Sequence, residues 1–408
     1  MKRPKVVILG AGFGGLTAAR ALRDFCDVVL IDRNNYQTFL PLLYQVSTAG
    51  LAADHIAYPI RGALRKAKIQ FRMGSPVSLD IKKKTIKLDS GESFEFDYLV
   101  VALGSVTNDF GIPGVREHTL GMKSLQEALH IRSTIMKNFE DLCRSGEEKD
   151  FVVNIVGGGP TGVEMAGAIA ELRNGPLRSD FAEAADRIKI NIIEAGPRLL
   201  PSFSPKLSKK TAMSLRKLGV EVLEDKSVAE IKSHSIVFTD KSVRKSDITV
   251  WTAGVKGETT AKKLHLPYER GRLKTEQTLQ VVDHPDIFAI GDISGCLGED
   301  GRFLPMVAPV AMQQGRFLAE QIKNLSQGKS ATTFVYRDKG SMATIGRNKA
   351  VVQVGKIGFS GIPAWYAWLW LHLFYLLGGR NKLGTMADWV WNYLTFDRSN
   401  RHIIDLEL

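Results

Sequence analysis

The sequence predicts an α/β protein that contains two parallel-sheet units of the same kind and a C-terminal segment of different character. An apolar run, a glycine-rich turn and a helical pattern follow one another from Val6, and the same succession starts again at Phe151. Residues 331–408 hold five of the six tryptophans. A chain of 408 residues is too long for one ordinary hydrophobic core, so we expect two or three domains.

The first glycine-rich turn, Gly10-Ala-Gly12-Phe-Gly-Gly15, fits the pattern GxGxxG. It follows the strand-like run Val6–Leu9 and opens a helix. Glycines at this spacing allow a tight turn and a close approach to a pyrophosphate, which then binds at the helix N-terminus. Asp32 ends the next apolar run, where an acid accepts a hydrogen bond from a ribose hydroxyl. The turn therefore predicts a Rossmann-like dinucleotide-binding domain.

The second turn, Gly157-Gly-Gly159-Pro-Thr-Gly162, repeats this arrangement, and Glu194 ends its next apolar run. One GxGxxG match alone is as often an ordinary glycine turn. Two matches, each with a strand, a helix and a terminal acid, indicate a duplicated nucleotide-binding unit. The carboxylate of Glu194 favours NADH over NADPH because it repels a 2′-phosphate, although Arg198 lies nearby and weakens that preference.

Charge and cysteine content exclude several classes of function. The formal net charge is +12, which favours anionic partners, but the basic residues are spread along the chain and no nucleic-acid motif accompanies them. The three cysteines form no CxxC pair, so we expect no disulfide framework, no metal site and a reducing compartment. The N-terminal apolar run is too short for a signal peptide. We therefore expect a chain that starts in the cytosol or has lost a transit peptide.

Three further stretches resemble the two-dinucleotide flavoprotein reductases: Phe96–Ser105, Asp247–Gly254 and Ile287–Asp292. The resemblance implies two Rossmann-like domains, the second inserted in the first, and a C-terminal membrane-associated segment. It implies an FAD-binding domain at 1–120 and 272–330, an NAD(H)-binding domain at 121–271, and a C-terminal interface and membrane-anchoring region at 331–408. The disulfide reductases of this superfamily need a redox cysteine pair, which this chain lacks.

Four stretches narrow the resemblance to the type II NADH:quinone oxidoreductases: Phe39–Leu51, Val307–Gly315, Tyr336–Arg347 and Asp388–Phe396. This family resemblance covers essentially the whole chain. It implies a non-proton-pumping enzyme that oxidises NADH through non-covalent FAD and reduces a membrane quinone by two electrons. One departure concerns the quinone site, where Pro309 replaces the first Gln of the family's Ala-Gln-x-Ala-x-Gln pattern. The side-chain contact of that Gln is lost.

The resemblance also implies the residues of three binding sites. FAD contacts are expected at Gly10, Gly12, Phe13, Gly14, Gly15, Asp32, Arg33, Val77, Ala102, Gly104, Asp292 and Ala308. NADH contacts are expected at Gly157, Gly159, Thr161, Gly162, Glu194, Ala253 and Gly254. Quinone contacts are expected at Tyr44, Gln45, Gln313 and Gln314.

Several of these residues have a structural alternative. Glu164, expected in the first turn of the second-unit helix, is our candidate catalytic residue, which orders the nicotinamide or relays a proton. The alternative is helix capping, since the helix dipole favours an acid there. For the two glutamines the alternative is a solvated helix face, and for Tyr44 and Gln45 it is packing under the flavin. Cys296 is more often a small buried residue than a redox centre.

The aromatic stretch Trp365–Gly379 has 15 residues and falls short of the roughly 20 needed to span a membrane. Trp and Tyr favour the membrane interface, and Arg380 and Lys382 follow the stretch. We expect a helix that lies in the membrane surface, on the cytoplasmic face of the inner membrane or an equivalent organelle membrane. The alternative is a buried core helix or a dimer seam, and a homodimer is expected in either case.

Two rival functions stay open. A sulfide:quinone oxidoreductase shares the fold and the tail but needs redox cysteines beside the flavin. Cys143 is expected in a charged loop at 141–150, and Cys296 follows the third flavin contact, so the match is poor. A flavoprotein like apoptosis-inducing factor binds NADH with slow turnover. Steady NADH oxidation with a short-chain quinone separates the leading function from this rival.

Overall fold

The computed structural model describes residues 3–65, 67–145 and 149–404 and divides the chain into two compact units. Unit 1 consists of Met1–Gln37, Tyr58–Val106 and Val255–Lys339. Unit 2 consists of Thr38–Ala57, Thr107–Gly254 and Gly340–Leu408. Both units are discontinuous in sequence. Unit 2 contains the second glycine turn, the segment 38–57 and the aromatic tail.

Unit 1 is built on a sheet whose parallel strands lie in the order β22 (His284–Ala289), β9 (Tyr98–Val101), β1 (Lys5–Leu9), β2 (Asp27–Asp32) and β5 (Ile69–Met73). A short strand, β21 (Gln280–Val281), pairs antiparallel with β22 at the edge. Val6 of β1 pairs with Val28 on one side and with Tyr98 on the other. The central strands are continuous apolar runs because both faces of a parallel sheet are covered.

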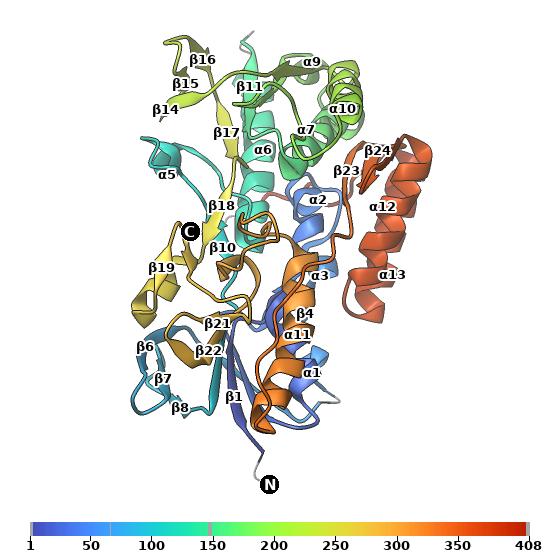
Figure 1. Ribbon diagram of the computed structural model, residues 1–408. Helices are drawn as coiled ribbons and strands as arrows, with labels where there is room; N and C mark the ends of the chain where they lie inside the picture. Colours follow the sequence, from blue (N-terminus) through green and yellow to red (C-terminus); the bar gives the residue numbers. More distant parts are fainter. Residues whose placement is uncertain (1–2, 66, 146–148, 405–408) are drawn as a thin grey trace. The chain divides into compact units, whose positions relative to one another are not determined.

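Two helices of unit 1 pack closely side by side, α1 (Phe13–Leu22) and α11 (Ala308–Ser326) (Figure 1). Glycines allow this approach, since a Cβ atom at Gly315 would lie 2.6 Å from the carbonyl oxygen of Gly14. The packing positions the N-terminus of α1, which follows the first glycine turn.

Unit 2 repeats the parallel arrangement with the strand order β13 (Val220–Leu223), β12 (Ile188–Ile193), β11 (Phe151–Val156) and β17 (Ile248–Trp251). Helix α7 (Pro160–Leu172) follows β11, as α1 follows β1. The insertion between α7 and β12 is mostly helical. The predicted duplication of a Rossmann-like unit is therefore confirmed.

An antiparallel sheet packs against α7 in unit 2. It consists of β23 (Ser341–Gly346), β24 (Lys349–Val354) and β25 (Ile357–Ser360). The backbones of α7 and β23 touch at Gly167, where a Cβ atom would lie 2.4 Å from the carbonyl oxygen of Ile345. This contact fixes one face of α7 against the strand.

Helix α6 (Leu125–Ser145) runs further than the sequence suggested. The predicted loop at 141–150 is wrong for its first five residues, so Cys143 lies on a helix and not in a loop. Leu142 is buried one turn after Phe139, which continues the apolar stripe of the helix. The charged residues between them belong to its outer face. Residues 146–148 of that predicted loop lie outside the described part of the chain.

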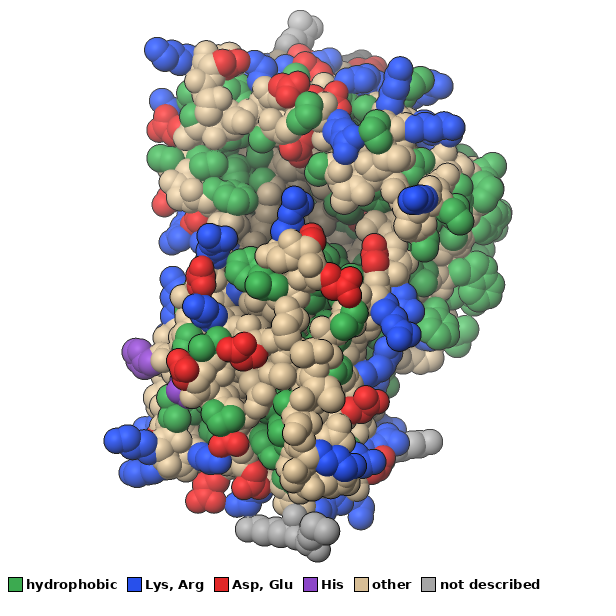
Figure 2. All heavy atoms as spheres, viewed as in Figure 1, with side chains coloured by type: hydrophobic (Ala, Val, Ile, Leu, Met, Phe, Trp, Pro, Cys, Tyr) green, Lys and Arg blue, Asp and Glu red, His purple; other side chains and the backbone are tan. Residues whose placement is uncertain are grey.

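The tail forms two helices: α12 (Ile362–Tyr375) packs against β24 (Figure 1), and α13 (Gly379–Thr395) packs against the short helix α3 (Ala53–Ile56). Ala364, Trp368 and His372 form the buried stripe of α12. The opposite face is apolar and open, with Trp370 and Phe374 each more than 70% exposed. Figure 2 shows apolar side chains gathered over these helices. Among the described residues, no helix has the length and hydropathy needed to cross a membrane.

Candidate functional site

The first glycine turn has the geometry that a dinucleotide needs. Gly10 has φ +104°, and a Cβ atom there would lie 2.3 Å from the carbonyl oxygen of Ala102. A Cβ atom at Gly15 would lie 1.8 Å from the carbonyl oxygen of Gly10. At Gly12, in contrast, a Cβ atom would meet no protein atom within 4 Å. That open position is the one where a pyrophosphate approaches the backbone, so the residues present fit the FAD that the sequence predicts.

The second turn repeats this geometry position by position. Gly157 has φ +114°, and a Cβ atom there would lie 2.6 Å from the Cα atom of Ala253. A Cβ atom at Gly162 would lie 1.9 Å from the carbonyl oxygen of Gly157, whereas Gly159 again has open space. Thr161 is exposed in the first turn of α7. Ala102 and Ala253, both predicted from resemblance, thus close their respective turns.

The terminal acids hold their turns in the same way. Asp32 accepts hydrogen bonds from the backbone N–H groups of Ala11 and Asn34, at 2.6 and 2.8 Å. Burial raises the pKa of Asp32, while these two hydrogen bonds lower it. Glu194 accepts hydrogen bonds from the N–H groups of Gly158 and Gly196, at 2.6 and 2.8 Å. Each acid therefore lies beside its glycine turn, where a ribose binds in this fold.

The other predicted FAD residues all lie in unit 1. Ser105 donates a 2.5 Å hydrogen bond to Asp292, which holds the carboxylate at the end of β22. Arg33 forms a 3.0 Å ion pair with the buried Glu258. The remaining members lie at the start of the two helices, in β6 (Pro76–Asp80) and after β9, and they are Phe13, Gly14, Ala308, Val77 and Gly104.

The two predicted quinone contacts on α11 bond to the protein's own backbone. Gln314 is buried, and its Oε1 accepts a 2.7 Å hydrogen bond from the N–H of Gly291. Gln313 donates to the carbonyl oxygen of Arg337 at 2.9 Å and accepts from its N–H at 3.1 Å. Both lie in the second turn of α11, and both belong to unit 1. The quinone candidates Tyr44 and Gln45 belong to unit 2 instead.

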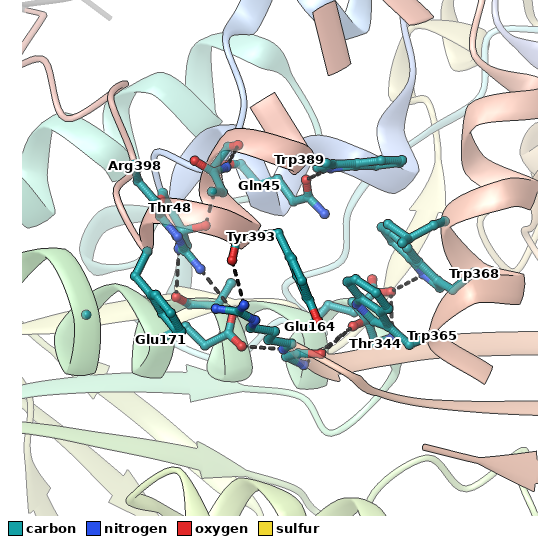
Figure 3. A pocket seen from close by; sticks show the side chains of 18 of the residues that line it. Gln45, Thr48, Glu164, Glu171, Thr344, Trp365, Trp368, Trp389, Tyr393 and Arg398 are labelled. Atoms are coloured by element: carbon teal, nitrogen blue, oxygen red, sulfur yellow. Dashed lines mark hydrogen bonds and ion pairs between the residues drawn. The ribbon is translucent and has the colours of Figure 1, made fainter. Parts of the chain in front are cut away.

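Unit 2 contains a largely apolar cavity of about 650 Å³, whose wall includes the predicted residues Tyr44, Gln45 and Glu164 (Figure 3). Such a volume is typical of small-molecule sites. The wall comes from α7, β23, the tail helices and the short helix α2 (Leu43–Ser47), and its other polar or aromatic members include Thr48, Glu171, Asn174, Thr344, Arg347, Trp365, Tyr366, Trp368, Trp370, Trp389, Asn392, Tyr393, Phe396 and Arg398.

Glu164 is buried in this wall. It is the fifth residue of α7, so its predicted place in the first turn is wrong, because the helix begins at Pro160. Its Oε1 accepts hydrogen bonds from the N–H of Thr344 at 3.3 Å and from the indole N–H of Trp368 at 3.2 Å. Burial raises the pKa of Glu164 to about 8, although both hydrogen bonds lower it. The carboxyl is therefore mostly protonated at neutral pH and can donate a proton.

Tyr44 and Gln45 form a hydrogen-bonded chain with the tail. The indole N–H of Trp389 donates to Oε1 of Gln45 at 2.7 Å, and Nε2 of Gln45 donates to the hydroxyl oxygen of Tyr44 at 2.9 Å. Burial raises the pKa of Tyr44 well above its usual value, so its hydroxyl stays protonated. With its oxygen already accepting from Gln45, the O–H can donate to a ligand carbonyl in the cavity.

A second acid of α7 belongs to the same wall. Glu171 follows Glu164 by two helical turns, accepts a hydrogen bond from the backbone N–H of Arg347, and forms a 3.1 Å ion pair with Arg398, whose side chain is 12% exposed. The ion pair is visible in Figure 3. Glu171, Trp368 and Trp389 were not identified from the sequence as residues of this site. The repeat of acids seven residues apart on one helix face was the available signal for Glu171.

Gly167 lies between these two acids, and we expect Gly167→Ala to lower the free energy of unfolding by roughly 1–3 kcal/mol. Alanine favours a helix more than glycine does, but here its Cβ would meet the carbonyl oxygen of Ile345. Urea unfolding measures the change. A variant as stable as the wild type would show that α7 and β23 do not touch there.

The thiols give no redox pair. Cys26 and Cys296 are buried, and burial raises their pKa values to about 12 and about 11. Both therefore stay protonated at neutral pH and lack the thiolate that redox chemistry needs. Cys143 is exposed on α6, and its pKa is also raised. No cluster of three metal-ligating side chains occurs among the described residues.

Comparison with known proteins agrees with this geometry. Residues 4–315 match the pyridine nucleotide-disulphide oxidoreductase family. The chain is 36% identical to the type II NADH:quinone oxidoreductase Ndh of Mycobacterium tuberculosis, over 99% of this chain and 91% of that protein. It is 31% identical to the type II NADH:quinone oxidoreductase of Staphylococcus aureus, over 86% of this chain and 90% of that one.

Two solved structures share the fold. NDH2 from Plasmodium falciparum, in complex with NADH, superposes with a TM-score of 0.89 at 22% identity, over 99% of this chain and all of that chain. The sulfide:quinone oxidoreductase of Aquifex aeolicus has a TM-score of 0.74 at 17% identity, over 96% of this chain and 95% of that one. The sequence relatives are the more specific match. The chain therefore belongs to the type II NADH:quinone oxidoreductases.

Proposed function

We propose that the chain binds FAD at the first glycine turn and NADH at the second, oxidises NADH, and reduces a quinone bound in the cavity of unit 2. Membership of the type II NADH:quinone oxidoreductases is the evidence for NADH oxidation and quinone reduction. FAD as the particular flavin, the residues at each site and the partners are our additions. Bound FAD supplies the two-electron chemistry, since a flavin accepts a hydride and passes electrons to a quinone.

The observation that carries the quinone site is the protonated, buried Glu164 in an apolar wall that also contains Tyr44. The hydride of NADH carries two electrons and one proton, so reduction of a quinone to the quinol needs one further proton. Glu164 donates this proton from a carboxyl whose pKa is about 8, and the Tyr44 hydroxyl donates a hydrogen bond that orients a carbonyl. The indole of Trp368 donates directly to Glu164, and the indole of Trp389 donates to Gln45, which in turn donates to Tyr44. The apolar wall excludes water, which strengthens both interactions.

Gln313 and Gln314 of unit 1 remain proposed quinone contacts, but each would exchange a protein hydrogen bond for one to the quinone. Pro309 lies in the first turn of the same helix and offers no donor for the quinone. The cavity of unit 2 therefore carries the quinone proposal by itself.

Steady-state oxidation of NADH and NADPH with a short-chain quinone tests the proposal. We expect ordinary turnover, above ~1 s⁻¹, with NADH and a much lower kcat/KM with NADPH, because Glu194 repels the 2′-phosphate. Turnover far below that value would support the slow-turnover rival. Equal rates with both cofactors would contradict the role of Glu194 alone.

The partners in this proposal are a membrane surface and a second copy of the chain, on the cytoplasmic face of the inner membrane or an equivalent organelle membrane. Trp370 and Phe374 are 73% and 72% exposed on the open face of α12. Arg380 and Lys382 lie just beyond that helix, where anionic lipid attracts them. Aromatic and basic side chains in this arrangement favour a helix that lies in the membrane interface.

Trp370→Ser together with Phe374→Ser is expected to weaken binding to anionic lipid vesicles by about 100-fold, since each loses roughly 1.5 kcal/mol of apolar burial. Vesicle co-sedimentation measures the change. Val243→Ser is the control, because Val243 is a 65% exposed apolar residue on β16 (Val243–Lys245). Unchanged binding of the double variant would refute the membrane face. If the face joins two copies instead, the double variant would dissociate into monomers in analytical ultracentrifugation.

A further inference from the structure

The cavity wall of unit 2 contains one positive charge that no carboxylate balances. Its charged residues are Glu164, Glu171, Arg347 and Arg398. Glu171 pairs with Arg398 at 3.1 Å, and Glu164 is mostly protonated at neutral pH. The guanidinium of Arg347 has no ion pair among the described residues. The wall therefore carries a net charge of about +1 at neutral pH, located at Arg347.

The protein holds the Arg347 guanidinium rigidly. It lies between the rings of Tyr393 and Phe396, 3.9 Å from each ring centroid, and Nη2 donates a 2.5 Å hydrogen bond to the carbonyl oxygen of Tyr393. The backbone N–H of Arg347 donates a hydrogen bond to Glu171. Gly346 makes that contact possible, since a Cβ atom there would lie 2.6 Å from Oε1 of Glu171. A side chain that is fixed on three sides presents its remaining donors in one geometry.

One of those donors is buried and unused. Nη1 of Arg347 is inaccessible to solvent and has no hydrogen-bond partner among the described residues. A buried charged donor without a partner is unusual and loses stability. Because solvent does not reach Nη1, a ligand in the cavity would meet the guanidinium at another of its atoms, where the positive charge is still not balanced by a carboxylate of the described residues. A guanidinium prefers an anionic oxygen over a neutral one.

We propose that Arg347 makes the cavity a binding site for an amphiphile that carries an anionic oxygen, such as the carboxylate of a single-chain fatty acid. The apolar part of the ligand would lie against Trp365 and Trp389, and the carboxylate would pair with the guanidinium of Arg347. The exposed apolar helices α12 and α13 border the cavity, so a molecule dissolved in lipid has a path to it. Because the same cavity is our proposed quinone site, such a ligand competes with quinone.

The test compares dodecanoate with dodecanol, which have the same chain length and differ in the charge of the head group. Binding to the oxidised full-length holoenzyme, without NADH or quinone, is followed by quenching of tryptophan fluorescence. The readout is the ratio of the two Kd values within each variant. A cavity that is merely loosened loses both ligands alike, so the ratio separates a direct contact from a structural effect.

We expect the preference for dodecanoate over dodecanol to fall by about tenfold or more in Arg347→Gln, which is the effect of one hydrogen bond to a charged group. Arg347→Lys should keep part of the preference, because the charge remains. Arg144→Gln is the matched control, since it removes one exposed charge from α6 outside the cavity. An unchanged ratio in Arg347→Gln, an equal loss in Arg144→Gln, or binding of neither amphiphile would overturn the proposal.

Competition between dodecanoate and quinone is measured separately, so that the anion site and the proposed quinone site can fail independently. Dodecanoate that inhibits competitively with quinone, with an inhibition constant equal to its measured Kd, supports a shared cavity. Dodecanoate that binds through Arg347 without affecting the KM for quinone leaves the anion site intact and removes quinone from this cavity.

Discussion

Replacing Glu164 with Gln is expected to lower kcat for quinone by about 100-fold, a value typical for the loss of a general acid. The carboxyl is buried in the cavity wall, where two hydrogen bonds fix it and burial keeps it protonated. Glutamine keeps the shape and the hydrogen bonds but cannot transfer a proton. With ferricyanide, an acceptor that needs no proton, the variant should oxidise NADH at the wild-type rate.

The raised pKa of Glu164 also predicts how quinone turnover changes with pH. The folded protein holds the Glu164 proton up to a pH of about 8, so quinone turnover should fall as the pH rises through that value. Glu164→Gln should remove this break. Trp368→Phe keeps the ring but removes an N–H that lowers the pKa, so the break should move to higher pH. A profile that is identical in all three proteins would assign the proton to another group.

The same shift affects stability. Because the pKa of Glu164 is raised on folding, the folded state binds the proton more strongly than the unfolded state between the ordinary glutamate pKa of 4.5 and about 8. Stability is therefore lost as the pH rises through this window. Thermal unfolding should show that Glu164→Gln raises Tm more at pH 9 than at pH 6.

The second large effect concerns the NADH turn, where Gly159→Ala and Gly162→Ala form a matched pair. A Cβ atom at Gly159 meets no protein atom within 4 Å, so Gly159→Ala should unfold at the wild-type temperature. The added methyl group nevertheless occupies the space where the pyrophosphate approaches the backbone. We therefore expect the KM for NADH to rise by about tenfold or more, the equivalent of one lost hydrogen bond to a charged group.

Gly162→Ala should fail in a different way. Its Cβ would lie 1.9 Å from the carbonyl oxygen of Gly157, so the turn itself must move. We expect lower Tm together with loss of NADH oxidation, whereas the flavin of unit 1 stays bound and the purified protein stays yellow. A stable Gly159→Ala variant with a normal KM for NADH would argue that no dinucleotide reaches this turn.

The repeated units could be predicted because their determinants are local. A GxGxxG turn requires backbone conformations that only glycine adopts readily, and the structure has φ above +100° at both Gly10 and Gly157. The acids that follow each turn, Asp32 and Glu194, lie against it as the spacing implied. The helix boundary was harder, since Pro160 at the first position moved Glu164 beyond the first turn.

The cavity could not be predicted, because its contacts join distant parts of the chain. Trp368 and Glu164 are 204 residues apart in sequence, and Trp389 and Gln45 are 344 apart. The tail is apolar on almost every side, so its periodicity does not separate a buried face from an exposed one. The sequence therefore indicated one membrane-facing helix, whereas α12 also buries Trp368 and His372 within unit 2.

Burial explains why a histidine occurs in so apolar a helix. His372 stacks on Trp368 with ring centroids 3.9 Å apart, and its Nδ1 is 2.7 Å from the carbonyl oxygen of the same residue. Burial lowers the pKa of His372 to about 4, so the ring stays neutral at physiological pH. The neutral imidazole of His372 therefore packs beside Trp368, the hydrogen-bond donor of Glu164, without adding a charge.

Anaerobic double-mixing stopped flow tests the central claim most directly, because it separates the two half-reactions. Mixing with NADH should bleach the flavin absorbance equally fast in the wild type and in Glu164→Gln. Mixing the reduced proteins with a short-chain quinone should restore the absorbance about 100-fold more slowly in the variant at pH 7. Reduced wild-type protein that quinone does not reoxidise, or equal recovery in both proteins, would contradict quinone reduction at Glu164.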